Sequence, residues 1–251
     1  MNERTVAKFN LYVSVILLAL LLLFFVGATL AYFSDTKQAT ATLTAGNVRI
    51  TLSESAVKEE GWNLVPDPES PRIFGGDGET VINDYGKIYP GQSIHKDPTV
   101  TNTGDSEEWI AAKVTLTDGA GDLTKIMGYE ETEYVDIEVL LSGGLLDELV
   151  HVGDWNGIPD VCHNDRYAMI QIPNASEGTF EFIFLMLQPV QPGESVVLFD
   201  NITIPSEWDN AEMKQLVSLK INVQAYGVQI TAMDSCLQAM TEAFPSHFNL
   251  S

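Results

Sequence analysis

The side chains that could do chemistry are few, and their spacing matches no catalytic or metal site. The chain has four histidines, and one segment combines two of them with a cysteine and acidic residues: His151, Asp154, Asp160, Cys162, His163 and Asp165. A zinc peptidase needs two imidazoles one helical turn apart, and a calcium loop needs a set series of oxygen ligands. This segment has neither spacing, and the chain has no serine-nucleophile elbow and no phosphate-binding glycine loop. We therefore predict a protein without enzymatic activity, metal site or cofactor, and leave weak Ca²⁺ binding by the acidic loops open.

The two cysteines, Cys162 and Cys236, allow two interpretations. Two are too few for a scaffold held together by disulfides. In an oxidising compartment they could form one disulfide that closes a long loop. Two buried thiols are the equal alternative, and the sequence does not decide between them.

The charge balance excludes some partners. The chain has 251 residues, with 13 Lys and Arg against 35 Asp and Glu, and its formal net charge is −22. Nucleic-acid binding needs basic side chains at the phosphates, so we predict no nucleic-acid partner. Binding to anionic lipid headgroups is disfavoured for the same reason.

The N-terminal 31 residues have the features of an export signal. Arg4 and Lys8 precede Leu11–Ala31, a stretch of 21 residues without a charge. Small residues come just before a polar segment, so we predict cleavage between Ala31 and Tyr32. The alternative is a retained membrane helix, because 21 apolar residues at 1.5 Å each can span a bilayer. In both cases the rest of the chain is expected outside the cell, in the matrix or at the cell surface.

Alternation of apolar and polar residues predicts short β-strands over most of the chain. The clearest segments are Ile110–Leu116, Val135–Leu141, Phe180–Met186 and Val217–Ala225. Each would have one buried and one solvated face, which is typical of antiparallel sheets. Turn signals separate the strands, at Pro90-Gly91, Asn102–Gly104, Gly143-Gly144 and Pro192-Gly193. The pattern predicts an all-β protein, an antiparallel jelly-roll β-sandwich with short helices in the connections.

The expected domain covers residues 47–230 and contains long polar insertions at 53–89 and 142–165. By default such insertions are solvated surface loops. One short helix is predicted at Glu207–Leu216, with Ser206 as its cap. A second is predicted at Thr231–Phe244, within a C-terminal tail of residues 231–251.

The segment after the predicted cleavage point changes its apolar phase at Gly46. Before Gly46 the apolar residues are odd-numbered, and after it they are even-numbered: Ala39, Ala41, Leu43 and Ala45, then Val48, Ile50 and Leu52. One regular strand cannot keep both sets on one face. A β-bulge at Gly46 would explain the change. The alternative is an N-terminal arm, residues 32–46, that adds itself to the sheet edge of a neighbouring copy and builds an open filament.

The same residues resemble the start of the TasA/camelysin family of exported matrix proteins, which carry a SipW-type signal peptide. The resemblance begins with Ala31–Thr36 and Ala39–Val48. It returns in scattered blocks that together cover about half of the chain: Tyr89–Ser93, Lys96–Gly104, Leu198–Asp200, Ile204–Trp208 and Leu219–Gln229.

This resemblance implies a jelly-roll subunit that a SipW-type signal peptidase processes and that polymerises into extracellular biofilm-matrix fibres. In such fibres the mature N-terminal segment is a donor strand that fills the groove of the next subunit. Carried onto this chain, the donor is about Tyr32–Ala45, with Gly46 as the hinge and with these apolar residues in the groove: Ala39, Ala41, Leu43 and Ala45. The implied partner is a second copy in a head-to-tail homopolymer, with accessory matrix proteins as further partners.

The two insertions do not match the fibre-forming members, so the resemblance leaves open a major or an accessory fibre subunit. A membrane-anchored surface protein of the same fold is a further alternative. Camelysin-like members are classed as metallopeptidases, an activity that the histidine spacing disfavours.

Overall fold

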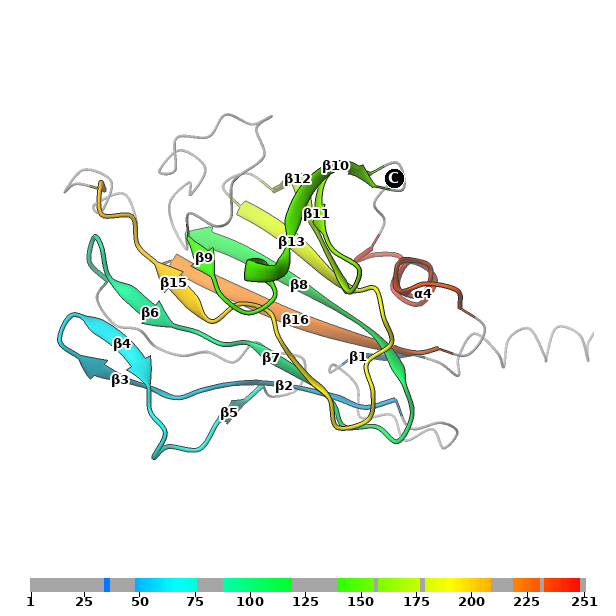
Figure 1. The fold of residues 1–251 in the computed structure, drawn as a ribbon, viewed down its shortest axis with the longest axis horizontal. Helices are drawn as coiled ribbons and strands as arrows, with labels where there is room; N and C mark the ends of the chain where they lie inside the picture. Colours follow the sequence, from blue (N-terminus) through cyan, green and yellow to red (C-terminus); the bar gives the residue numbers. More distant parts are fainter. Residues whose placement is uncertain are drawn as a thin grey trace, which may run out of the picture.

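The computed structural model describes residues 34–36, 48–75, 88–118, 140–155, 158–176, 179–208, 219–230 and 233–248. Figure 1 shows strands throughout this part of the chain and one α-helix, so the predicted all-β class is confirmed. No helix among these residues is both long and apolar enough to cross a membrane. The predicted export signal lies outside the described residues.

The largest sheet has seven antiparallel strands. In spatial order they are β1 (Ser34–Thr36), β16 (Leu219–Gln229), β8 (Glu108–Asp118), β13 (Thr179–Met186), β12 (Tyr167–Ser176), β11 (Ile158–His163) and β10 (Val150–Trp155). The alternations at Ile110–Leu116 and Phe180–Met186 lie within β8 and β13, as predicted. The alternation that ends at Ala225 lies in β16 from Leu219 onward. Of the predicted strand at Val135–Leu141, residues 135–139 lie outside the described residues.

A second layer consists of two smaller sheets. The chain passes from one sheet to the other between consecutive strands. One has the order β14 (Ser195–Val197), β7 (Thr99–Asn102), β2 (Ile50–Glu54), β5 (Ile73–Phe74). The other has the order β3 (Val57–Glu60), β4 (Asn63–Pro66), β6 (Ser93–His95), β15 (Asn201–Thr203), β9 (Leu141–Ser142). Backbone hydrogen bonds bridge the break between them, from Lys96 N to Asp200 O at 3.0 Å and from Leu198 N to Pro98 O at 3.0 Å.

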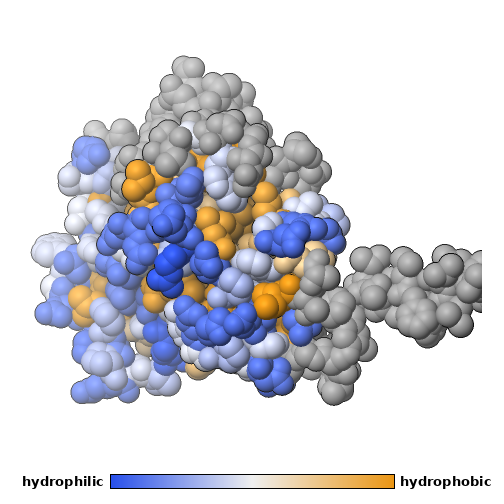
Figure 2. All heavy atoms as spheres, turned by 45° about the vertical axis from the view of Figure 1, so that its right-hand side comes forward, coloured by the Kyte–Doolittle hydropathy of each residue, from blue (hydrophilic) through white to orange (hydrophobic). Residues whose placement is uncertain are grey.

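Two hydrophobic cores lie on opposite faces of the seven-stranded sheet. Even-numbered residues of β8 face the core between the layers, together with Ile50 and Leu52 of β2. The odd-numbered residues Trp109 and Ala111 face a second core that contains the helix α4 (Cys236–Ala243). The expected solvated face is therefore wrong for Trp109 and Ala111, because the C-terminal segment covers this end of the sheet (Figure 1). Further along β8, Lys113 and Thr115 are partly exposed, as expected. On the face shown in Figure 2, hydrophilic residues interleave with apolar areas.

Helix α4 lies within the predicted segment Thr231–Phe244. It begins after Ser235, whose hydroxyl accepts a hydrogen bond from the backbone N–H of Gln238 at 3.2 Å, as an N-cap does. The other predicted helix, Glu207–Leu216, lies mostly outside the described residues.

The two expected surface insertions both contain regular structure. Residues 53–89 include the β3–β4 hairpin and β5, which belong to the second layer. Residues 142–165 include the short 3₁₀ helix η2 (Leu146–Glu148) and the β10–β11 hairpin, which extends the seven-stranded sheet. The expectation of irregular loops is wrong for these parts, because backbone pairing with a neighbouring strand orders them. The side chains of the β3–β4 hairpin are nevertheless mostly exposed, as expected of a surface insertion.

The turn at Gly143-Gly144 depends on glycine. Gly144 has a φ of +58°, and a Cβ there would lie 2.6 Å from Val197 O and 2.9 Å from the backbone of Phe199. We expect Gly144→Ala to lower the free energy of unfolding by about 3 kcal/mol, from the left-handed conformation together with a clash against backbone. Gly61→Ala is the matched control, because Gly61 has a φ of +64° with no atom within 4 Å. It should lose only about 1 kcal/mol in urea unfolding, and equal losses would contradict the clash.

Candidate assembly site at the edge of the seven-stranded sheet

Strand β1 occupies one edge of the seven-stranded sheet. Its three residues pair antiparallel with β16, with Ser34 opposite Val228 and Thr36 opposite Tyr226. All eleven residues of β16 pair with β8 on the inner side. Within the described residues, no strand pairs with the outer side of Leu219–Ala225. An edge of this kind presents backbone groups that another strand can pair with.

The core is less well covered along this open part of β16. Val223 and Ala225 are 1% and 6% exposed and belong to the core between the layers. Leu219 and Ile221, on the same face, are only partly buried and pack against the rim of that core. This edge, to which no described strand pairs, therefore borders apolar surface that a further strand could bury.

Strand β2 begins directly against β16, at Gly227. A Cβ on Gly227 would lie 3.0 Å from Ile50 Cγ2 and 3.5 Å from Val48 Cγ1, so the absence of a side chain permits the close approach. The carboxylate of Glu108, which is fully buried, accepts a hydrogen bond from Arg49 N at 2.9 Å. These contacts hold the start of β2 at the same end of β16 as β1.

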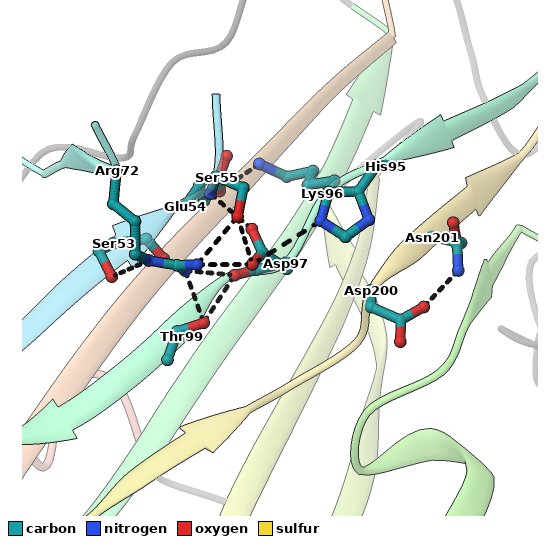
Figure 3. A network of polar contacts seen from close by, with 10 residues as sticks. All are labelled: Ser53, Glu54, Ser55, Arg72, His95, Lys96, Asp97, Thr99, Asp200 and Asn201. Carbon is teal, nitrogen blue, oxygen red and sulfur yellow. Dashed lines mark hydrogen bonds and ion pairs between the residues drawn. The ribbon is translucent and has the colours of Figure 1, made fainter. Parts of the chain in front are cut away.

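A polar network fixes the other end of β2 (Figure 3). Glu54 and Lys96 form an ion pair, and their side chains are 0% and 2% exposed. Glu54 continues the inward-facing series of Ile50 and Leu52, so its carboxylate points into the protein. Burial lowers the pKa of the Lys96 ammonium below its ordinary value, although the Glu54 carboxylate opposes this shift.

Asp97 is the centre of the second half of this network. Its carboxylate accepts hydrogen bonds from Ser55 N at 2.6 Å and from Arg72 Nη1 at 2.8 Å. Arg72 also donates to Ser53 Oγ at 3.1 Å and to Thr99 Oγ1 at 2.8 Å, so it joins β2, β5 and β7. Burial raises the pKa of Asp97, but the hydrogen bonds from Ser55 and Arg72 outweigh it and hold the pKa below its ordinary value.

The residues predicted for export and strand donation lie outside the described residues. These are Ala31 and Tyr32 of the cleavage point, Ala39, Ala41, Leu43 and Ala45 of the donor strand, and the hinge Gly46. The described part begins within the predicted arm at β1 and resumes at Val48.

The structure contains no disulfide between Cys162 and Cys236. Cys162 packs against the core between the layers, whereas Cys236 belongs to the core on the opposite face of the sheet. The Cys236 thiol donates to the carbonyl of Ile110 at 3.3 Å, and burial raises its pKa. Of the two interpretations left open, the structure therefore contradicts the disulfide, because the sheet itself separates the two sulfurs.

The histidines and acidic residues singled out from the sequence form no metal site in the described part of the chain. No group of three or more His, Cys, Asp or Glu side chains there could hold a metal ion. The ring of His163 packs against Trp155, with 5.9 Å between ring centroids. The side chains of His151, Asp154 and Asp160 lie outside the described ones.

Comparisons with known proteins provide no relative. No family model, curated protein or solved structure matches the chain. Membership of the TasA/camelysin family therefore stays a prediction from the quoted motifs.

Proposed function

We propose that the protein is a secreted, non-catalytic structural subunit of the jelly-roll type. It polymerises head to tail into extracellular matrix fibres when the N-terminal arm of one copy pairs with β16 of the next. The observation that supports this proposal is the pairing of Ser34–Thr36 with one end of β16, next to an open edge. In an isolated chain the start of the arm covers three residues of its own edge, and in the polymer a neighbour's arm replaces it.

The register of β1 gives the arm a chemical match to the rest of β16. Each step forward from Thr36, which pairs with Tyr226, corresponds to one step back along β16. A strand that continued this register would set Ala39 opposite Val223, Ala41 opposite Ile221 and Leu43 opposite Leu219. Directly opposed residues of antiparallel strands share a face. The odd-numbered apolar side chains of the arm would therefore cover the exposed rim of the core between the layers.

A strand that follows this whole path must come from another copy. The position opposite Leu219 lies eight residues along β16 from Gly227, which is about 26 Å at roughly 3.3 Å per residue. Leu43 precedes Val48 by five residues, and five extended residues reach at most about 18 Å. Because Val48 packs against Gly227, an arm paired up to Leu43 cannot return to its own β2. Pairing over the full length thus favours exchange between copies, and a head-to-tail exchange propagates without closing.

Electron microscopy of two chain lengths tests the proposal. We expect Tyr32–Ser251 to form filaments and Asn47–Ser251, which lacks the arm, to stay monomeric. Filaments from both would move the interface away from the arm. Monomers from both, under conditions in which the longer chain is folded, would contradict polymerisation.

A matched pair of point variants tests the register within that experiment. Leu43→Asp should abolish filaments, because its carboxylate would be buried without a partner against the core. Thr42→Asp adds the same charge one residue earlier, on the opposite face of the strand, and should leave the filaments intact. Equal behaviour of the two variants would contradict the proposed register.

A further inference from the structure

A groove lies on the second layer, between the β3–β4 turn and the turn that leads into β6. It has a volume of about 510 Å³ and is lined by Trp62, Asn63, Tyr89, Pro90, Gly91 and Gln92. Trp62 and Asn63 belong to the turn and first residue of the β3–β4 hairpin, and the other residues form the turn that leads into β6. Strands β4 and β6 are neighbours in the sheet, which brings the two turns together (Figure 1). The groove is intermediate between an enclosed cavity and a flat surface, so one side of it is open to solvent.

Two aromatic rings form a corner of this groove. Trp62 is 77% exposed and Tyr89 is 46% exposed. Their ring centroids lie 6.0 Å apart, and the ring planes are nearly perpendicular, at 78°. The two rings therefore form two adjoining walls. Large aromatic side chains this exposed leave apolar area in water unless a partner covers it.

Two side-chain amides that line the groove use their oxygen atoms for contacts with the backbone. Gln92 is only 6% exposed, and its Oε1 accepts a hydrogen bond from Tyr89 N at 3.0 Å. The Oδ1 of Asn63 accepts from Ser93 N at 3.0 Å. Because backbone N–H groups occupy both carbonyl oxygens, each NH₂ group is the part of the amide left to donate. A buried amide held in this way is a preorganised donor at the groove.

We propose that this groove binds a neutral polysaccharide built of pyranose sugars. The C–H face of a sugar ring packs on Trp62, and its hydroxyl oxygens accept hydrogen bonds from the amides of Asn63 and Gln92. Among the residues that the structure describes, the lining consists of aromatic and amide side chains with Pro90 and Gly91 and without a charged residue, which suits a neutral ligand. The net charge of −22 disfavours an acidic polysaccharide. This site is independent of the proposed assembly edge, and it would let the protein attach to a glycan of the matrix or the cell surface.

Calorimetric titration of the purified full chain with cellohexaose and chitohexaose tests this site, with polygalacturonate as the charged comparison. We expect at least one neutral oligosaccharide to bind and polygalacturonate not to bind. Trp62→Ala should weaken binding at least tenfold, which corresponds to about 1.4 kcal/mol, and Trp62→Phe should restore part of it. Phe74→Ala removes an aromatic side chain that is 62% exposed but does not line the groove, and it should bind as the unchanged protein does.

Three outcomes would overturn the polysaccharide site. The first is no binding of either neutral oligosaccharide at millimolar concentration by a folded chain. The second is binding that Trp62→Ala and Phe74→Ala weaken equally. The third is loss of filaments in Trp62→Ala without any saccharide binding by the unchanged protein, which would make the groove a contact between copies.

Discussion

Replacing Glu54 by leucine should lower the free energy of unfolding by about 3–5 kcal/mol, the usual loss when one partner of a buried ion pair is removed. The Lys96 side chain is 2% exposed, so its ammonium would lose the facing carboxylate in a place that water hardly reaches. Lys96→Met should lose a similar amount for the opposite reason, because it leaves the Glu54 carboxylate buried without its cation. Urea unfolding followed by tryptophan fluorescence measures both.

The double variant Glu54→Leu with Lys96→Met separates the ion pair from simple packing. Replacing both charges by apolar side chains of similar size is often neutral or stabilising. We therefore expect the double variant to be more stable than either single variant. If the two losses simply add, the side chains act independently and the ion pair is not what holds this end of β2.

Asp97→Asn should destabilise the protein by about 2–3 kcal/mol at neutral pH, because a charged acceptor of several hydrogen bonds is lost. The effect should depend on pH in a defined direction. The pKa of Asp97 in the folded protein lies below its ordinary value of 3.8. Its charge thus stabilises the fold fully above about that pH, and this contribution disappears as the pH falls through the folded-state pKa.

The stability difference between the unchanged protein and Asp97→Asn should accordingly shrink as the pH is lowered below 3.8. Asp67→Asn provides the control, since the pKa of Asp67 is also lowered, chiefly by its hydrogen bond to Ser70, but the group lies at the surface and is partly exposed. That variant should change the unfolding midpoint little at any pH. If Asp97→Asn loses the same unfolding free energy at every pH, then the hydrogen-bond geometry of the side chain, and not its charge, holds Arg72 in place.

The strands that could be predicted are those in which the polarity of each residue indicates whether its side chain is buried or exposed. In β8 the apolar residues Ala112, Val114 and Leu116 alternate with polar ones, so the period of two appears directly in the sequence. In β13 the alternation is limited to Phe180–Phe182, because residues 182–186 are all apolar. Strand β3 has mostly exposed side chains and no such alternation. It is held by backbone pairing with β4, which depends on a partner that no local pattern reveals.

The polar network was missed because charged side chains are ordinarily read as solvated. One signal was available. Glu54 follows Val48, Ile50 and Leu52 in the even-numbered series, so the phase of β2 already directed its carboxylate inward. Nothing comparable marks Arg72 or Lys96, whose partners come from elements 25 and 42 residues away. The burial of Trp109 and Ala111 on the second face of β8 likewise depends on α4, more than a hundred residues later in the chain.

The anchoring of β2 at both ends has a mechanical consequence. In a fibre built by arm exchange, tension along the fibre would act on each subunit through its arm. The force would reach the folded domain at Val48, two residues before β2 begins. At that point Arg49 N is held by the buried carboxylate of Glu108. Four residues beyond the start of β2, the load meets the Glu54–Lys96 ion pair. Just after it, Arg72 and Asp97 join the end of β2 to the neighbouring strand β7. Pulling would therefore shear several buried bonds together rather than peel the strand away one residue at a time.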